Sequence, residues 1–309
     1  MGHDHGHGHG HGHAHHHHEP PASYDRAFAI GIGLNLAYVA AETVAGIVAG
    51  SLALLADAGH NLSDVLGLAL AWGAAWLARR QPTARRTYGL RRSSILAALA
   101  NAMLLLVAIG AIAWEAVKRL QEPEPVATGI VLLVACIGVL INGGTALMFM
   151  RGRENDLNIR GAFLHMAADA GITLGVMAAA LVIGWTGWLW LDPVTSLAIA
   201  AVILVSTWGL LRDSVDLALD AVPRGIDPAE VRSFLQAQPG VAEVHDLHIW
   251  AMSTTETALT AHLVLPDALP DDGFLARLRH DLDHRFRIGH ATIQVERGDP
   301  CPQAPAHVV

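Results

Sequence analysis

Long apolar runs separated by short polar segments dominate the first two thirds of the chain. Each of six runs is close to the roughly 20 residues that a helix needs to cross the hydrocarbon core of a bilayer. The runs cover residues 27–48, 54–77, 95–116, 126–150, 161–184 and 189–211. The pattern predicts an all-α membrane domain of six transmembrane helices over residues 26–212.

The pattern after residue 212 is typical of a water-exposed domain. Asp227 is a suitable N-cap, Pro228 suits the first helical position, and Glu230 follows three residues after the cap, so a helix should begin here. The predicted order is a helix in 227–240, strands in "VAEVHDLHIWAM" and "ETALTAHLVLP", a helix at 271–286 and a strand at 290–296. This α-β-β-α-β order predicts a small α+β domain over 213–296, with its helices on one face of the sheet.

The two ends of the chain differ from both domains. Residues 1–25 are rich in glycine and histidine, cannot bury a core, and are expected to be disordered. A native metal-buffering arm is the favoured interpretation and a cloning tag is the alternative. The proline-rich residues 297–309 are expected to form a loose tail. The histidines of the arm are His3, His5, His7, His9, His11, His13, His15, His16, His17 and His18.

Composition supports a membrane protein and argues against several other classes. Of the 309 residues, 52% are hydrophobic and only 16% are charged, whereas soluble proteins carry about 25% charged residues. The net charge of −8 does not suit nucleic-acid binding. The two cysteines, Cys136 and Cys301, imply no disulfide framework. The chain has no phosphate-binding G-x-x-x-x-G-K-[ST] motif, so no nucleotide cofactor is expected.

Basic residues are concentrated in two of the connections between runs. Residues 79–92 contain six arginines and residues 151–160 contain three, while the connections at 49–53 and 185–188 contain no basic residue. The positive-inside rule therefore predicts that both termini are cytoplasmic. No secretory signal or organelle signal is visible, which favours a bacterial plasma membrane.

Two of the apolar runs carry the same pair of polar residues at the same spacing. His60 and Asp64 in the second run, and His165 and Asp169 in the fifth, are each four residues apart and so lie on one helix face. Carboxylates are costly inside a bilayer and usually mark a function there. Two imidazoles and two carboxylates suit a tetrahedral Zn²⁺ site. The alternative is that the histidines only form interhelical hydrogen bonds and the aspartates face a water-filled cleft.

Other polar residues in the runs allow more than one interpretation. Asp57 precedes His60 by three residues and shares its helix face. It could be a fifth ligand, a proton acceptor or a cap near the helix start, and a role in supporting the ligands or in starting the helix is favoured. Asn35 and Asn142 are further candidates for such supporting contacts, although packing through interhelical hydrogen bonds is the default interpretation. Glu42 is ambiguous, because it could face the water outside the membrane.

Several segments resemble the cation diffusion facilitator family, in particular its bacterial zinc, cobalt and cadmium efflux members. They are "SLALLADAGHNLSDV", "PTARRTYGLRRSSILAAL", "HMAADAGITLGV", "WLDPVTSLAIAAVIL" and "VAEVHDLHIWAMS" with "TAHL" and "HATIQVE". The resemblance covers about residues 24–296. It implies six transmembrane helices, a metallochaperone-like cytoplasmic domain, homodimers, and export of divalent metal in exchange for protons. Relatives often carry an acid where this chain has Ser93 and Ser94.

The resemblance also implies which residues bind metal. The transport site corresponds to His60, Asp64, His165 and Asp169, and Zn²⁺ is the expected substrate, with Co²⁺, Cd²⁺, Ni²⁺ or Fe²⁺ as further candidates. A regulatory Zn²⁺ site in the cytoplasmic domain would use His245, His262, His290 and Glu296. On a regular strand His245 and His248 would lie on opposite faces, so both could not join one site without distortion. The expected partners are the lipid bilayer, metal, protons and a second copy of the chain.

Two other functions compete with transport. A membrane zinc sensor that binds the ion without moving it would have a similar sequence. An intramembrane metalloenzyme would need an H-E-x-x-H motif and an open metal position, and the sequence has no such motif. We therefore expect a transporter that is not an enzyme.

Overall fold

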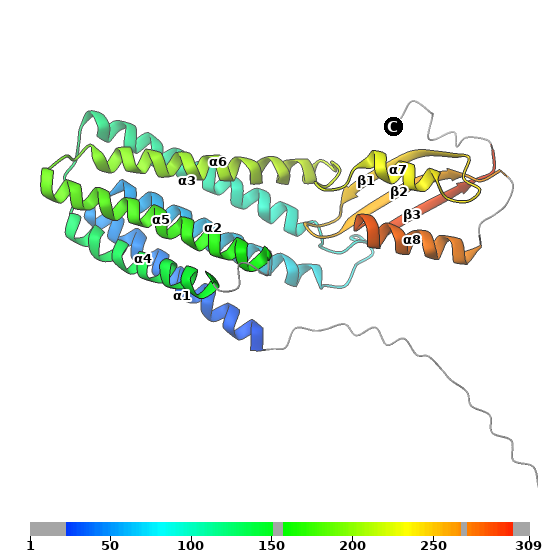
Figure 1. Cartoon of the computed structure of the whole chain (residues 1–309), viewed down its shortest axis with the longest axis horizontal. Coiled ribbons are helices and arrows are strands. Elements are labelled where there is room, and N and C mark those ends of the chain that lie inside the picture. Colours follow the sequence, from blue (N-terminus) through cyan, green and yellow to red (C-terminus); the bar gives the residue numbers. More distant parts are fainter. Residues whose placement is uncertain (1–22, 151–156, 267–270, 299–309) are drawn as a thin grey trace, which may run out of the picture.

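The computed structural model describes residues 23–150, 157–266 and 271–298, and it divides the chain into a helical bundle and a smaller domain (Figure 1). The predicted fold class is confirmed, since six helices are followed by elements in the order α-β-β-α-β. Each bundle helix is within a few residues of a predicted apolar run. The bundle helices are α1 (Ser23–Ala49), α2 (Leu52–Ala78), α3 (Ser93–Gln121), α4 (Thr128–Met150), α5 (Leu157–Thr186) and α6 (Leu191–Ala218).

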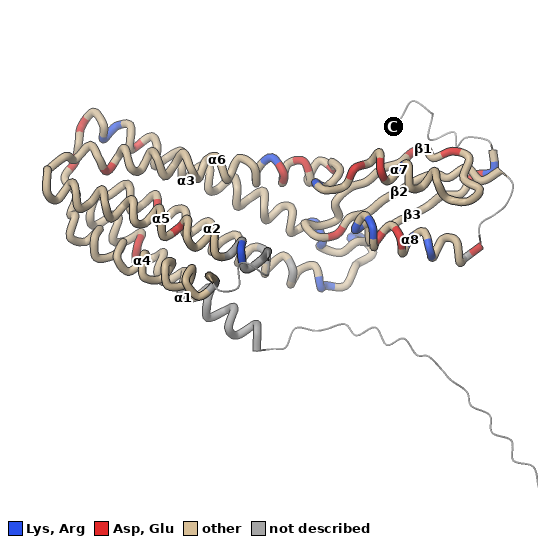
Figure 2. Tube along the Cα trace, in the orientation of Figure 1, with Lys and Arg blue, Asp and Glu red and all other residues tan. Residues whose placement is uncertain are grey.

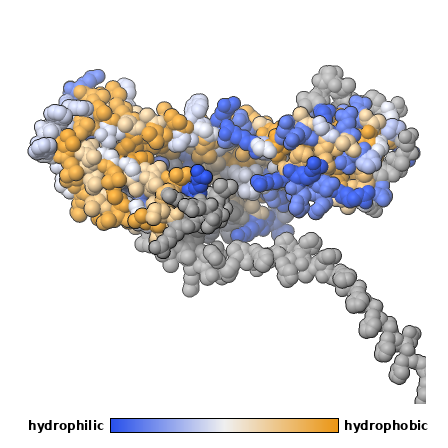
Figure 3. All heavy atoms as spheres, in the orientation of Figure 1, coloured by the Kyte–Doolittle hydropathy of each residue, from blue (hydrophilic) through white to orange (hydrophobic). Residues whose placement is uncertain are grey.

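The bundle has apolar side chains on its outside and polar groups in its interior. Large residues such as Leu104, Val107 and Val205 are exposed, and apolar atoms cover most of the visible bundle surface while charges concentrate at the loops and the smaller domain (Figures 2 and 3). In water such a surface would be unfavourable, but lipid is a suitable neighbour for it. Within the described residues, five helices are long and apolar enough to span a membrane, and α1 contributes the shorter apolar stretch Asn35–Ala49.

A buried carboxylate fixes the start of α2 at the end of the bundle farthest from the smaller domain. Asp192 of α6 accepts hydrogen bonds from Ser51 Oγ at 2.5 Å and from the Leu52 and Ala53 amides at 2.7 and 3.3 Å. These amides would otherwise be unpaired at the helix start. Gly50 precedes the cap with a φ of 64°, a conformation that favours glycine. The contact anchors the helix that carries His60 and Asp64.

The smaller domain is a three-stranded sheet packed against two helices. Strand β2 pairs with β1 in the antiparallel direction and with β3 in the parallel direction. Asp227 caps α7 by accepting from the Ala229 amide at 2.8 Å, as predicted from the sequence. Leu235 of α7, Leu282 of α8 and Leu259 of β2 are fully buried in one core. The elements are α7 (Pro228–Gln236), β1 (Glu243–Ala251), β2 (Thr257–Val264), α8 (Asp272–Phe286) and β3 (His290–Glu296).

Polar contacts join the two parts of the molecule. Arg91, just before α3, donates to Glu256 at 3.0 Å, and Arg92 pairs with Asp220 after α6. Ser94 Oγ accepts a hydrogen bond from the Thr254 amide at 3.1 Å. Ser94 therefore contacts the turn between β1 and β2.

Candidate metal centres

Helices α2 and α5 bring the two predicted His-x-x-x-Asp pairs together inside the bundle. His60 Nε2 lies 3.1 Å from Asp169 Oδ1, and His165 Nε2 lies 3.4 Å from Asp64 Oδ2. His165 Nε2 is also 3.7 Å from Asp169 Oδ2, and the two imidazole rings are 6.5 Å apart. Each imidazole thus faces a carboxylate of the opposite helix. One ligand atom from each of His60, Asp64 and Asp169 lies within 4.8 Å of the others.

The geometry follows from the spacing and the packing of the helices. Residues four apart share a helix face, so α2 and α5 each present one imidazole and one carboxylate toward the other. Nitrogen and oxygen ligands in this number suit a four-coordinate Zn²⁺ ion. A divalent ion would also neutralise the two carboxylates, which are unfavourable in a low-dielectric interior when they have no countercharge.

Exposure of the four side chains changes along the bundle. The exposed fraction is 4% for Asp169 and 16% for His60, but 36% for Asp64 and 46% for His165. Along α2, Asp64 lies one turn nearer to the smaller domain than His60 does. Along α5, His165 lies one turn nearer to the smaller domain than Asp169 does. The cluster is therefore more accessible from the side of the smaller domain than from the far side.

The predicted supporting residues have different environments. Asp57 is fully buried in α2 and lies well inside the helix, whose N-cap is Ser51, so it does not start the helix. Asn35 is exposed and Asn142 is half-buried. Within the described part of the chain, neither asparagine has a hydrogen bond to the four clustered side chains.

Glu42 was left ambiguous by the sequence and is fully buried in the structure. Its carboxyl group accepts hydrogen bonds from Asn61 Nδ2 at 3.0 Å and from the Tyr38 hydroxyl at 3.2 Å. The sequence did not predict that Tyr38 and Asn61 are hydrogen-bonded to Glu42 between α1 and α2. The available signal was the four-residue spacing of Tyr38 and Glu42 on one face of an apolar helix.

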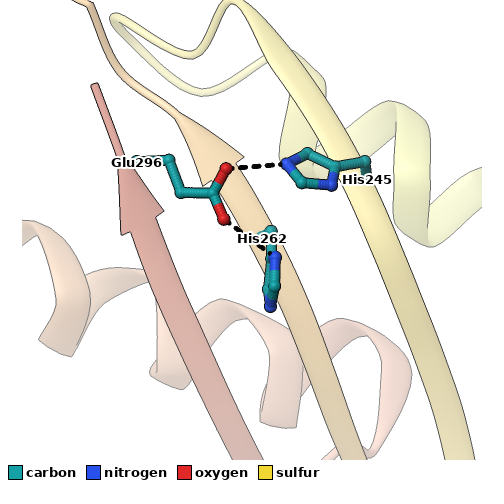
Figure 4. Close-up of side chains that lie close together, drawn as sticks. All are labelled: His245, His262 and Glu296. Carbon is teal, nitrogen blue, oxygen red and sulfur yellow. Dashed lines mark hydrogen bonds and ion pairs between the residues drawn. The ribbon is translucent and has the colours of Figure 1, made fainter. Parts of the chain in front are cut away.

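A second cluster lies on the face of the sheet that points away from α7 and α8 (Figure 4). Glu296 Oε2 lies 3.0 Å from His245 Nε2, and Glu296 Oε1 lies 2.9 Å from His262 Nδ1. His245 and His262 are directly paired across β1 and β2. The three side chains offer ligand atoms within 4.8 Å of one another, so they could hold a metal ion with two nitrogens and one oxygen.

The structure places the other predicted residues of this cluster differently. His290 begins β3, six residues before Glu296, and its ring packs edge-on against Tyr88, so it is not part of the cluster. An irregularity in the β1–β2 pairing lies between His245 and His248, and Asp246 has a φ of 50°. A bulge of this kind shifts the alternation by one residue. Both histidines therefore lie on the same face, contrary to the expectation for a regular strand.

His248 extends the cluster through Asp246. The imidazole of His248 lies 2.9 Å from Asp246 Oδ1, and His262 Nε2 lies 3.4 Å from Asp246 Oδ2. Asp246 thus faces two histidines at the edge of the His245–His262–Glu296 group. The ten histidines of the N-terminal arm lie outside the described residues.

Comparison with known families decides the class of protein. Residues 28–217 match the model of the cation efflux transmembrane domain, and residues 223–298 match that of the cation efflux protein cytoplasmic domain. The chain belongs to the cation efflux family. The resemblance inferred from the motifs is thereby confirmed, and the chain is an integral membrane protein of a family of transporters.

Relatives in the cation efflux family match nearly the whole chain. The metal cation efflux system protein CzcD of Cupriavidus metallidurans is 39% identical, covering 93% of this chain and 90% of its own. The zinc transporter ZitB of Escherichia coli is 37% identical over a match that covers 94% of this chain and 92% of that transporter. A cadmium, cobalt and zinc/H⁺–K⁺ antiporter of Bacillus subtilis is 36% identical over a match that covers 84% of this chain and 85% of the antiporter.

Proposed function

We propose that this protein exports Zn²⁺ from the cytoplasm by alternating access, in exchange for protons. The observation that carries the proposal is the convergence of His60, Asp64, His165 and Asp169 from two separate helices. This ligand set suits zinc, and it lies inside a bundle whose outer surface is apolar. Zinc transport by the relative ZitB, and zinc, cobalt and cadmium exchange by the Bacillus relative, support the same substrate class.

Proton exchange follows from the chemistry of the ligands. Zinc binds neutral imidazole and ionised carboxylate, so its binding expels protons and its release allows protons to return. Histidine has an ordinary pKa of about 6.5, close to the pH of the cytoplasm. A site open to a more acidic exterior would take up protons and release the metal. A site open to the cytoplasm would lose those protons and bind the next ion.

The proposed orientation places both termini and the smaller domain in the cytoplasm of a bacterial cell. The arginine-rich connections at 79–92 and 151–160 support it through the positive-inside rule. In this orientation, the more exposed residues Asp64 and His165 lie on the cytoplasmic side of the cluster. We take this arrangement to be the state that accepts metal from the cytoplasm.

The remaining parts of the chain have supporting roles in the proposal. The transport domain spans residues 26–212 and the regulatory domain spans 213–296, where His245, His262 and Glu296 would bind a second Zn²⁺. The regulatory domain would also join two copies in a homodimer. The histidine-rich arm would raise the local metal concentration as a tethered pool of weak sites.

Metal flux into proteoliposomes tests transport directly. The wild-type chain should accumulate zinc when the vesicle interior is acidic, and Asp64→Ala and Asp169→Ala should not. A membrane zinc sensor is the alternative, and it would bind zinc without any flux. Flux in both aspartate variants equal to that of wild type would remove this site from the transport path.

A further inference from the structure

A carboxylate lies beside the sheet cluster (His245, His262 and Glu296) and is not one of its three candidate ligands. The two carboxylate oxygens of Asp246 face different imidazoles: Oδ2 lies 3.4 Å from His262 Nε2, and Oδ1 lies 2.9 Å from His248 Nε2. The exposed fraction of the side chain rises from 13% for His262 to 23% for Asp246 and 48% for His248. Asp246 therefore joins a candidate ligand to an exposed histidine.

His262 has a carboxylate beside each of its ring nitrogens. Nδ1 lies 2.9 Å from Glu296 Oε1, and Nε2 lies 3.4 Å from Asp246 Oδ2. In Figure 4 one nitrogen of this ring is turned toward Glu296 and the other away from it. A neutral imidazole carries one N–H group and one lone pair, so His262 can donate to only one of the two carboxylates. Its other nitrogen then directs a lone pair at a carboxylate, which is favourable only when a cation lies between them.

The surroundings of the two nitrogens favour the proton on Nε2. Within the described residues, Nδ1 of His262 is buried and has no hydrogen-bond partner, although Glu296 Oε1 lies 2.9 Å away. That oxygen is therefore close to Nδ1 but off the direction of an N–H bond from it. The contact of Nε2 with Asp246 is slightly longer than an ordinary hydrogen bond of about 2.7–3.2 Å, and a small movement of the carboxylate would close it. A proton on Nε2 leaves the lone pair of Nδ1 directed at the shared space of the cluster.

The backbone of β1 holds Asp246 in this place. Asp246 has a φ of 50°, a left-handed conformation that is uncommon for residues other than glycine, and it lies at the irregularity between His245 and His248. In a regular strand its side chain would point to the face opposite to that of His245. The bulge instead brings the carboxylate to His262 and His248. Backbone conformations of this kind often occur at functional sites.

We propose that Asp246 is a positioning residue of the regulatory zinc site: it accepts the Nε2–H of His262 and so directs Nδ1 of that ring at the ion. His248 holds the carboxylate through its second oxygen. Histidines that bind metals commonly donate their other N–H group to a carboxylate or a carbonyl, which fixes the tautomer and the orientation of the ring. The proposal rests on the proposed regulatory function of the sheet cluster, and it adds two residues that do not themselves touch the ion.

The first test is the zinc affinity of the full-length protein in detergent, measured in a background chain that lacks the other proposed zinc sites. In this background the ten histidines of the arm are replaced by serine, and Asp64 and Asp169 are replaced by alanine. His262→Ala in the same background provides the blank. A blank that binds zinc as tightly as the background chain would overturn the regulatory site itself, whatever the role of Asp246.

We expect Asp246→Gly to bind zinc about 10–100-fold more weakly than the background chain, because either nitrogen of His262 can then carry the proton. Glycine adopts a positive φ without strain, so the substitution removes the carboxylate and keeps the local backbone. His248→Ala should weaken zinc binding by a smaller factor, since it removes only a support of the carboxylate. Equal zinc affinity in Asp246→Gly and the background chain would overturn the proposal.

Asp220→Gly is the matched control for the change of backbone. Asp220 also has a positive φ, of 61°, but it lies after α6 and pairs with Arg92 at the junction of the two domains. Asp220→Gly should bind zinc as tightly as the background chain. A loss of affinity in Asp220→Gly equal to that in Asp246→Gly would overturn the proposal, because the effect would then come from the glycine and not from the missing carboxylate.

A second measurement needs neither zinc nor a substitution at Asp246, so it does not depend on the folding of those variants. Nitrogen-15 NMR of the histidine-labelled background chain, at about pH 8.5 where an ordinary histidine is neutral, distinguishes protonated from unprotonated ring nitrogens. The difference from the spectrum of His262→Ala isolates this ring. We expect the proton of His262 on Nε2. A proton on Nδ1, alone or together with one on Nε2, would overturn the proposal.

Discussion

The two metal clusters of this molecule use similar ligands on very different supports. His60, Asp64, His165 and Asp169 come from two helices, α2 and α5, which share no main-chain hydrogen bond in the described part of the chain. His245, His262 and Glu296 come from three neighbouring strands whose main chains are hydrogen-bonded in one sheet. A relative movement of α2 and α5 can separate the first set, whereas the second set can separate only if the sheet breaks.

This difference suits the two proposed roles. A transport site must bind its ion on one side and release it on the other, so its ligands need two arrangements of similar energy. A regulatory site only has to report the metal concentration, and rigid ligands do this well because little ordering is required on binding. The same chemistry can therefore give a movable site or a fixed sensor, depending on whether packing or hydrogen bonds hold the ligands.

The largest effect should come from a single aspartate in the membrane cluster. Asp169→Ala removes a buried carboxylate that contacts both histidines, and zinc flux into proteoliposomes should fall by at least about 100-fold. Glu122→Ala, which removes an exposed acid outside both clusters, should transport normally. Substantial zinc flux in Asp169→Ala would show that transport does not require the membrane cluster, and the contrast between a movable and a fixed cluster would then fail.

The pH dependence of zinc binding should be similar at both clusters, since each contains two histidines. Bound zinc requires neutral imidazole, so affinity rises with pH and falls as the histidines protonate. Each cluster contains two imidazoles, so affinity should fall with decreasing pH, by up to about 100-fold per pH unit where protons compete with zinc at both rings. In chains that lack residues 1–20, measurements on Asp64→Ala/Asp169→Ala report the sheet cluster, and those on His245→Ala/His262→Ala report the membrane cluster. A pH-independent affinity at either one would exclude histidine ligation there.

Loss of the sheet cluster should change the zinc dependence of transport and leave the maximal rate largely intact. In His262→Ala the zinc concentration for half-maximal flux should rise about fivefold, a typical size for coupling between distinct sites. His284→Ala, at an exposed histidine of α8, is the matched control. A collapse of the maximal rate in His262→Ala would show that the sheet cluster takes part in transport itself.

The smallest effect should come from the histidine-rich arm. Deleting residues 1–20 should raise the zinc concentration for half-maximal flux by about twofold, because the arm only concentrates metal near the site. An arm with all ten histidines replaced by serine should behave like the deletion. Abolished flux in either variant would contradict the buffering role.

Sequence patterns alone were sufficient for the fold and for the residues that meet in the membrane. The lengths of the apolar runs specified six helices, because only a helix satisfies its own backbone in lipid. The repeated His-x-x-x-Asp spacing indicated one face on each of two helices. The N-cap at Asp227 was visible because capping depends on residues adjacent in the chain.

Only the tertiary structure decided how the remaining polar residues are used. Burial of Glu42 against Asn61 depends on how α1 packs against α2, and no periodicity reports that packing. His290 is excluded from the sheet cluster and His248 joins its face because strand register and a local bulge determine side-chain direction. The sequence determined properties that depend on neighbours along one helix or strand. Contacts between elements required the fold, because they depend on packing angles and pairing registers that no single segment encodes.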